Sequence, residues 1–202
     1  MLIANYLSLS QYAIENIGKL SSINQIKSHF SSEIQDITEQ RHGELESLDP
    51  LFYMQSISQF VGQKNYFLKF KDEEFNGEIS LDFIPTNMKN YLENTLIKKR
   101  PELIKSELVN FRCQLFFNNL SDNNKFKEKH KQLLNNITGL YGKGNNSEDE
   151  IKLAGDYKQV FGVDVLCWIF SRYEKYYHIT LYFSSKDSAP FSSFSVQRMI
   201  ET

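Results

Sequence analysis

A strong strand pattern occupies residues 65–83, NYFLKFKDEEFNGEISLDF. Apolar side chains occupy alternate positions in each half of it: Tyr66, Leu68 and Phe70, then Ile79, Leu81 and Phe83. Successive side chains of a strand point to opposite faces, so this alternation indicates strands with one buried face. The charged stretch 71–74 and Gly77, which lie between the halves, suit a turn. The sequence therefore predicts a β-hairpin.

Helices are expected on both sides of this hairpin, because apolar residues recur there at the helical period of about 3.6 residues. The expected helices cover 3–17, 23–37, 51–60, 86–96 and 126–137. Further strands are expected at 111–117, 163–170 and 179–183, where apolar residues alternate or form a short run. Residues 142–150, rich in glycine, asparagine and acidic residues, are expected to form a loop.

Runs of helix followed by strands that are mainly joined as hairpins indicate an α+β fold. We expect N-terminal helices packed with a largely antiparallel sheet of about five strands. The chain of 202 residues fits a single domain over 1–184, with a helical part (1–62) and a sheet-containing part (63–184). Residues 185–202, which contain several serines and Pro190, are expected to form a C-terminal tail that orders only on a partner.

Composition weighs against several classes of protein. The 23 basic and 25 acidic side chains nearly cancel, so no overall field attracts nucleic acid or an anionic membrane. The N-terminus has no signal-peptide pattern, and no apolar run reaches the about 20 residues that a membrane-spanning helix needs. Cys113 and Cys167 lie inside apolar runs, which is typical of buried thiols. We therefore expect a cytoplasmic protein with reduced cysteines and no membrane insertion. The heavy use of Asn, Lys, Ile and Ser favours a bacterial or phage source.

One pattern suggests catalysis, His178-Ile179-Thr180. In a strand, His178 and Thr180 share one face, where an imidazole and a hydroxyl could together hold a phosphate. The pattern resembles one His-x-Thr strand motif of the 2H phosphoesterase family, which implies that the His acts as acid or base and that the Thr binds phosphate. That family carries two such motifs, and the other match here, 29–31, lies in an expected helix. A phosphoesterase-like enzyme using His178 and Thr180 is therefore the first alternative hypothesis, and a non-enzyme is favoured.

Other catalytic and metal patterns are incomplete. His29 and Glu33 are one helical turn apart, and Glu39 and His42 have the Glu-x-x-His spacing of di-iron proteins, but no second copy of that spacing occurs. The Gly-Lys-Gly stretch at 142–144 lacks the rest of a P-loop and precedes acidic residues. We therefore expect no metal and no cofactor.

Basic residues gather at two places that could contact nucleic acid: Lys98, Lys99 and Arg100, and then Lys125, Lys127, Lys129, His130 and Lys131. Glu128 interrupts the second cluster, and such runs are usually the solvated face of an amphipathic helix. No aromatic-rich basic strand accompanies them to stack bases. Nucleic-acid binding is the second alternative and is not favoured.

Aromatic residues with polar atoms crowd the last expected hairpin: Trp168, Tyr173, Tyr176, Tyr177 and Tyr182. Such side chains are common anchors at protein interfaces, although a sheet covered on both faces would bury them. Acidic groups at Asp72, Glu73 and Glu74, and at 148–150, would attract a basic partner. The leading hypothesis is a non-catalytic protein-binding protein, either an immunity or inhibitor protein or a subunit of a larger assembly.

Overall fold

A computed structural model describes residues 2–30, 33–48, 63–73, 75–85, 106–116, 123–161, 163–184 and 191–199. Its helices are α1 (Tyr6–Asn16), α2 (Ile23–Phe30), α3 (Thr38–Leu48), α7 (Asn123–Tyr141) and α8 (Glu148–Phe161). Its long strands are β4 (Lys64–Asp72), β5 (Phe75–Pro85), β6 (Ser106–Phe116), β7 (Val165–Arg172), β8 (Lys175–Ser184) and β9 (Phe191–Arg198). Three two-residue strands are β1 (Leu2–Ile3), β2 (Leu20–Ser21) and β3 (Gln35–Asp36). The expected α+β class is confirmed. The helices expected over 51–60 and 86–96 lie outside the described residues.

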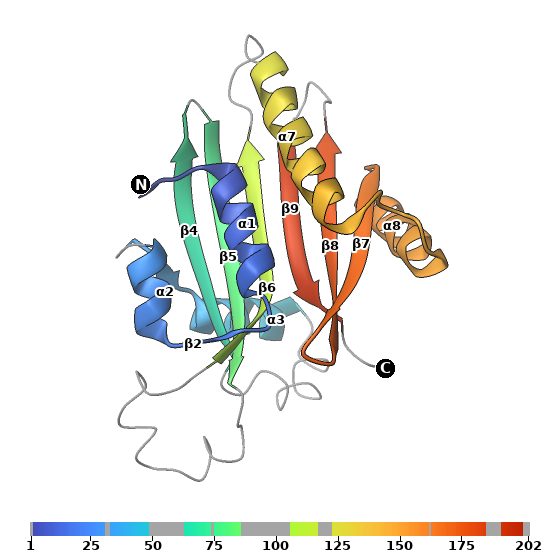
Figure 1. Ribbon diagram of the computed structural model, residues 1–202. Helices are drawn as coiled ribbons and strands as arrows, with labels where there is room; N and C mark the ends of the chain where they lie inside the picture. Colours follow the sequence, from blue (N-terminus) through green and yellow to red (C-terminus); the bar gives the residue numbers. More distant parts are fainter. Residues whose placement is uncertain are drawn as a thin grey trace.

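Two three-stranded antiparallel meanders, β4-β5-β6 and β7-β8-β9, form one sheet. They meet through their third strands, since β6 pairs antiparallel with β9 at the centre of the order β4-β5-β6-β9-β8-β7 (Figure 1). The short strands β1 and β3 pair with β4, and β2 pairs with β6. Among the described residues the sheet has nine strands, and only the β1–β4 pairing is parallel. The expectation of a largely antiparallel sheet is confirmed, but about five strands was too few.

The stretch expected to be a C-terminal tail contains a central strand of the sheet. β9 runs between β6 and β8 and pairs with both of them. Its Phe194 and Val196 enter the core, while Ser192, Ser193 and Ser195 are also buried. Serines at these positions hide the strong apolar alternation that marks the other strands, which is why the sequence suggested a tail.

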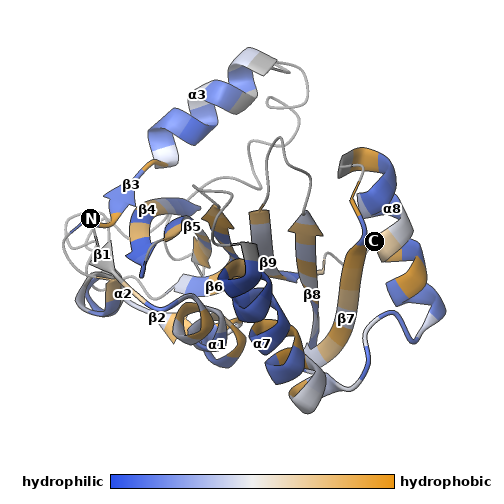
Figure 2. Ribbon diagram, turned by 90° about the horizontal axis from the view of Figure 1, so that it is seen from above, coloured by the Kyte–Doolittle hydropathy of each residue, from blue (hydrophilic) through white to orange (hydrophobic). Residues whose placement is uncertain are grey.

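Helices cover the two faces of the sheet unequally. α1 and α7 lie side by side on the face turned to the viewer in Figure 1, the front face, and α2 lies on the same side (Figure 2). α3 and α8 lie at opposite ends of the other face, the back face (Figure 2). No described helix covers the middle of the back face, across β5, β6 and β9. The helices are therefore spread along the chain and are not all N-terminal, as had been expected.

The front face carries the main hydrophobic core. The apolar positions of the long strands, at alternate residues, point to α1 and α7 and are buried there. Core residues of the strands include Leu68, Ile79, Phe111, Ile179 and Phe194, and those of the two helices include Tyr6, Ala13, Phe126, Leu133 and Ile137. Burial of this apolar face fixes the register of each strand, and with it the side chains that point to the back.

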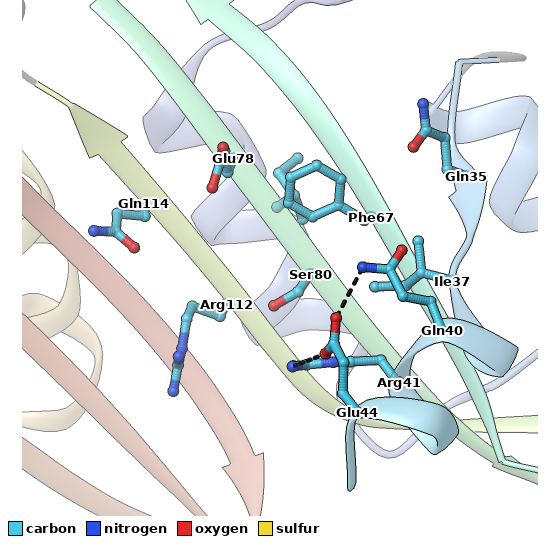
Figure 3. Close-up of a pocket in the computed structure, with 11 residues that line it drawn as sticks. Gln35, Ile37, Gln40, Arg41, Glu44, Phe67, Glu78, Ser80, Arg112 and Gln114 are labelled. Carbon is cyan, nitrogen blue, oxygen red and sulfur yellow. Dashed lines mark hydrogen bonds and ion pairs between the residues drawn. The ribbon is translucent and has the colours of Figure 1, made fainter. Parts of the chain in front are cut away.

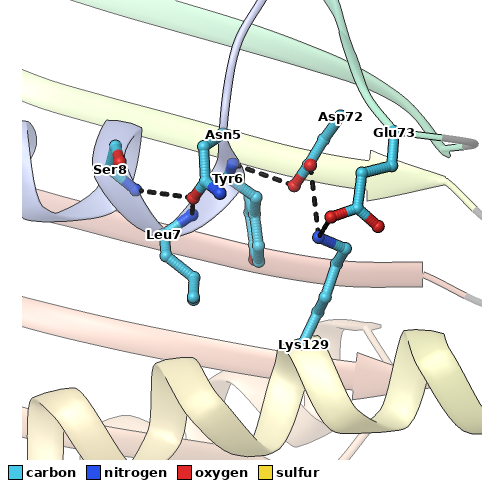
Figure 4. A network of polar contacts seen from close by, with 7 residues as sticks. All are labelled: Asn5, Tyr6, Leu7, Ser8, Asp72, Glu73 and Lys129. Atoms are coloured by element: carbon cyan, nitrogen blue, oxygen red, sulfur yellow. Dashed lines mark hydrogen bonds and ion pairs between the residues drawn. The ribbon is translucent and has the colours of Figure 1, made fainter.

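A buried carboxylate joins α1, the turn between β4 and β5, and α7 (Figure 4). Asp72 accepts hydrogen bonds from the backbone N–H of Tyr6 at 2.9 Å and from Nζ of Lys129 at 3.2 Å. Lys129 Nζ also lies 3.3 Å from Glu73 Oε1. Asn5 caps α1, because its side-chain oxygen accepts two backbone N–H groups of the first turn. The contacts join three segments that are far apart in sequence.

The stretch 23–37, which was expected to be a single helix, contains the helix α2 and the two-residue strand β3. α2 ends at Phe30, and β3 pairs with β4 before α3 begins at Thr38. Asp36 accepts the backbone N–H of Thr38 at 3.0 Å, which satisfies a donor at the start of α3. Pairing with β4 therefore overrides the local helical period.

The loop expected over 142–150 is shorter than predicted, because α8 begins at Glu148. Ser147 Oγ accepts the backbone N–H of Glu150, and Glu150 Oε2 accepts the N–H of Ser147, both at 3.1 Å. This reciprocal arrangement is a capping box, which has the sequence signature Ser-x-x-Glu. The signature is present in the sequence at 147–150 and would have predicted this helix start.

The same loop protects the outer edge of β7. Asn145 donates its backbone N–H to the carbonyl of Cys167 at 2.9 Å, and its side-chain oxygen accepts the N–H of Cys167 at 2.8 Å. Its side-chain amide donates to the carbonyl of Val165 at 3.1 Å. Glu150 Oε1 accepts the N–H of Ile169 at 3.2 Å. A loop thus takes the hydrogen bonds that another strand would otherwise form at this edge.

Candidate binding face

The strand registers align polar side chains in rows across the back face. In the middle row, Arg112 of β6 is paired with Ser80 of β5 on one side and with Ser195 of β9 on the other. Ser195 is paired in turn with Thr180 of β8. Because the apolar residues between them point to the front core, these side chains point to the back.

Several of these polar groups are hydrogen-bonded to one another. Asp82 accepts hydrogen bonds from the side-chain amides of Asn65 at 2.6 Å and Asn110 at 2.7 Å. The hydroxyl groups of Thr180 and Ser195 also share a hydrogen bond. Such satisfied pairs hold neighbouring strands in place and give the back face a defined shape.

One pocket on this face lies between α3 and the sheet and has a volume of about 380 Å³ (Figure 3). We call it the α3 pocket; its lining includes Gln40, Arg41 and Glu44 from α3, Phe67 from β4, Glu78 and Ser80 from β5, and Arg112 and Gln114 from β6. Glu44 accepts a hydrogen bond from Gln40 at 2.9 Å and lies 3.8 Å from Arg41 Nη1. The pocket therefore combines amide and hydroxyl groups with charges of both signs.

A second pocket, of about 220 Å³, adjoins the first. We call it the Phe191 pocket; its lining is Val163, Tyr182, Phe191 and Ser193, together with Arg112 and Gln114. Arg112 and Gln114 line both pockets, so the two lie next to each other over the strands from β4 to β8, and we call them together the groove. Among the described residues, Arg112 is the one charged residue that lines the Phe191 pocket.

Arg112 is an exposed cation at the centre of this groove. No residue in the described part of the chain forms an ion pair with it. Arg41, at the other side of the α3 pocket, is instead paired with Glu44. Burial raises the pKa of the nearby Tyr182, and the positive charge of Arg112 partly opposes that rise. The groove therefore offers a ligand a positive charge that has no ion-pair partner among the described residues.

Sequence reasoning missed Arg112 and Gln114 as candidate residues, although a signal for them was present. The strand expected at 111–117 has Phe111 and Cys113 on its apolar face. Arg112, which lies between these two residues, and Gln114, which follows Cys113, must point to the opposite face. Their meeting with α3 and Phe191 depends on tertiary structure, which strand alternation does not predict.

The His-x-Thr pair lies on the back face next to α8, with its two side chains on one side of β8 as alternation predicts. His178 is only 7% exposed, and burial lowers its pKa to about 4. Its Nε2 lies 3.5 Å from Oη of Tyr157 on α8. Thr180 is completely buried. Both groups are therefore largely closed to solvent.

Two of the other histidines lie on the front side of the sheet. His29, of the second His-x-Ser match, stacks its ring on Tyr12 of α1 with ring centres 3.9 Å apart. Residue 31 of that match lies outside the described residues. His130 Nδ1 lies 3.0 Å from Oγ of Ser192, which is buried. Neither histidine shares the back face with His178.

The residues of the candidate metal sites lie in or next to α2 and α3. Glu39 and His42 lie in α3, and His29 lies in α2 with Glu33 beyond its end. Across the described ranges, no three His, Cys, Asp or Glu side chains are grouped so that they could hold a metal.

Cys113 and Cys167 are free and buried, as expected from their apolar surroundings. Burial raises the pKa of both thiols, to about 12 for Cys167. A thiol with so high a pKa is a poor nucleophile at neutral pH.

Only two of the five aromatic residues predicted to bind a partner are accessible. Tyr173 and Tyr176, at the tip of the β7–β8 hairpin, are 63% and 56% exposed. Trp168 and Tyr177 lie in the front core, and Tyr182 is buried on the back face, where it packs against Tyr157 of α8. Helices of the front face bury Trp168 and Tyr177, whereas Tyr182 lines a pocket on the back face.

The acidic residues predicted to attract a basic partner are engaged within the fold in part. Asp72 is buried and Glu73 is exposed, and both are paired with Lys129. Glu74 lies outside the described residues. Glu150 is buried and caps α8, whereas Glu148 and Asp149 are exposed in the first turn of that helix. A basic partner therefore stays a prediction.

The basic cluster of α7 is only partly exposed. Lys125, Lys127 and Lys131 are exposed, but Lys129 is 12% exposed and paired with Asp72. The second basic cluster, 98–100, lies outside the described residues, so its position relative to α7 is not described.

Within the described residues, no helix is both long and apolar enough to span a membrane. Comparison with known proteins found no relative: no protein-family model matches the chain, and neither a curated protein nor a solved structure does.

Proposed function

We propose that this protein is a non-catalytic protein-binding protein that receives a segment of its partner in the groove on the back face. The observation that carries the proposal is the junction of the two pockets at Arg112 and Gln114, in the middle of a rigid sheet. Both roles expected from the sequence, an immunity or inhibitor protein and a subunit of an assembly, would use such a surface.

The lining of the groove supports a polypeptide as the ligand. Gln35, Gln40 and Gln114 offer both donors and acceptors, which suits the alternating N–H and C=O groups of an extended chain. The Phe191 pocket adds apolar surface from Val163 and Phe191 for a side chain. Concave surfaces with few, well-placed polar groups are typical binding sites.

The residues of the phosphoesterase alternative support catalysis less well. His178 and Thr180 are both buried, and neither lines the groove. The phosphoesterase alternative has its own test, because cleavage of a generic phosphodiester that disappears in His178→Ala would replace the present proposal. Nucleic-acid binding through α7 would appear as an affinity that falls steeply with added salt.

Photo-crosslinking in the cells that produce the protein tests the proposal. A photoreactive phenylalanine analogue is placed at Gln114 in the groove or, as a control, at Asn135, which is exposed on α7. The groove position should give a discrete crosslinked polypeptide that the control position does not give. Equal products from both positions, or none from Gln114, would contradict binding in the groove.

A further inference from the structure

We infer that the partner segment carries an aspartate or glutamate side chain that pairs with Arg112, next to an apolar side chain that enters the Phe191 pocket. This inference rests on the proposed function and adds the chemistry of the partner. It identifies the partner as a polypeptide with an acidic and an apolar residue close together in an extended stretch.

The charge of Arg112 is the first argument. Several other cations around the sheet have acidic partners: Arg41 with Glu44, Lys69 with Glu78, Lys129 with Asp72, and Lys175 and Arg198 with Glu107. Arg112 has none among the residues that the structure describes. Its two cross-strand neighbours, Ser80 and Ser195, carry no charge. A guanidinium held in a groove between protein walls is best satisfied by an anion of the ligand.

Carboxylate fits this position better than phosphate does. A carboxylate matches the planar fork of one guanidinium with two parallel hydrogen bonds. A phosphate group carries nearly two negative charges at neutral pH and would need more than one cation. The adjoining α3 pocket contains Glu44 and Glu78, whose charges would repel a doubly charged anion more than a singly charged one.

The Phe191 pocket supplies the apolar part of the argument. Val163, Tyr182 and Phe191 line it beside Arg112. Its volume of about 220 Å³ is several times the roughly 30 Å³ that one water molecule occupies in the liquid. The space is large enough for a side chain of several carbon atoms. An apolar residue there would be adjacent to the residue that pairs with Arg112.

The length of the groove sets the length of the segment. It extends over the strands from β4, which contributes Phe67, to β8, which contributes Tyr182. Neighbouring strands lie about 4.8 Å apart, so four such spacings measure about 19 Å. An extended chain rises about 3.3 Å per residue, which gives about six residues. The partner contact is thus a short linear segment.

Defined peptide pools test this inference on the purified, full-length protein. Each pool consists of fluorescent peptides of about six residues, in which a central position is Glu, Gln or Lys and is followed by Leu, with the remaining positions randomised. Binding is measured by fluorescence anisotropy. The wild type should bind the Glu pool about tenfold more tightly than the Gln pool and should bind the Lys pool least.

Substitutions of Arg112 make the test specific. Arg112→Gln should remove the preference for Glu, and Arg112→Glu should reverse it towards the Lys pool. Lys152→Gln, which removes an exposed charge on α8 outside the groove, is the matched control and should behave as the wild type. Equal binding of the Glu and Gln pools, an unchanged preference in Arg112→Gln, or no binding of any pool would overturn the inference.

The crosslinking experiment separates this inference from the proposed function. If the Gln114 crosslink forms equally well in Arg112→Glu, a partner occupies the groove but does not use a carboxylate on Arg112. If the crosslink is absent in the wild type, the proposed function itself is wrong.

Discussion

Arg172, at the end of β7, joins the first helix to the last hairpin. Its Nη1 donates hydrogen bonds to the carbonyls of Ile14 at 2.7 Å and Ile17 at 3.1 Å, at the C-terminus of α1. Its guanidinium also lies over the ring of Phe170, 5.5 Å from the ring centre. The last carbonyls of a helix have no partner within the helix, and a positive charge there is favourable. One side chain therefore supplies hydrogen bonds to the last carbonyls of α1, which are more than 150 residues away in sequence.

Replacing Arg172 with alanine should lower the free energy of unfolding by about 2–3 kcal/mol, because several charged hydrogen bonds are lost and buried carbonyls remain. Urea unfolding followed by the fluorescence of the single tryptophan, the buried Trp168, measures this change. Lys158→Ala is the control, since Lys158 and Asp164 form an exposed pair whose loss should cost less than about 1 kcal/mol. A similar loss in both variants would show that Arg172 is no more than a surface charge.

At the scale of elements, the two ends of the sheet are protected in different ways. β1 and β3 pair with β4 at one end, and the loop before α8 occupies the edge of β7 at the other. An unprotected edge strand can pair with another molecule. Asn145 is suited to its place because its φ of 58° is tolerated by asparagine and because its amide can both donate and accept.

Asn145→Gly should expose the edge of β7, because glycine accepts the same backbone conformation but lacks the amide that bonds to Cys167 and Val165. We expect a loss of about 1–3 kcal/mol in the free energy of unfolding. We also expect self-association that grows with protein concentration, measured by size-exclusion chromatography with light scattering. Asn145→Asp, which keeps the acceptor for Cys167, should show a smaller effect. A stable, monomeric Asn145→Gly variant at all concentrations would be inconsistent with edge protection.

At the scale of the whole molecule, a half-buried histidine on the front of the sheet and a buried one on the back make stability depend on pH. Burial lowers the pKa of His130, on the front, and of His178, on the back, to about 4 from the usual 6.5. The unfolded chain therefore takes up protons between pH 6.5 and pH 4 that the folded protein does not. Stability is fully present above pH 6.5 and falls as the pH is lowered towards 4.

His178→Gln should reduce this dependence, because glutamine does not take up a proton in the unfolded chain. Between pH 7 and pH 5, the wild type should lose about 2 kcal/mol more stability than the variant, since one fewer proton is linked to unfolding. Urea unfolding at the two pH values measures the difference. Equal losses in the two proteins would show that His178 can be protonated in the folded state.

Much of the sheet could be predicted from the sequence. Strong alternation marked β4, β5 and β6, and a dense apolar run with the alternation after it marked β7 and β8. β9 was missed because Ser192, Ser193 and Ser195 fill positions that are buried but not apolar. α8 was missed because its acidic first turn was interpreted as loop, although the capping box at 147–150 was visible.

The candidate site was less predictable than the fold. The sequence pointed to aromatic side chains of the last hairpin, of which only Tyr173 and Tyr176 are exposed. Burial of an aromatic residue depends on whether a helix covers its face, and local sequence does not determine that. Arg112 appeared as an ordinary polar residue of a strand until α3 and Phe191 were placed around it.

By itself, the sequence determined the α+β class, the main antiparallel hairpins and the burial of both cysteines, because each follows from periodicity within a short stretch of chain. Only the tertiary structure decided that two meanders meet at β6 and β9, and that helices cover the back of the sheet at its ends. The groove results from that arrangement, as does the position of Arg112 at its centre without an ion-pair partner among the described residues. The physical reason is that alternation determines which side chains share a face, whereas long-range pairing and packing determine which faces meet.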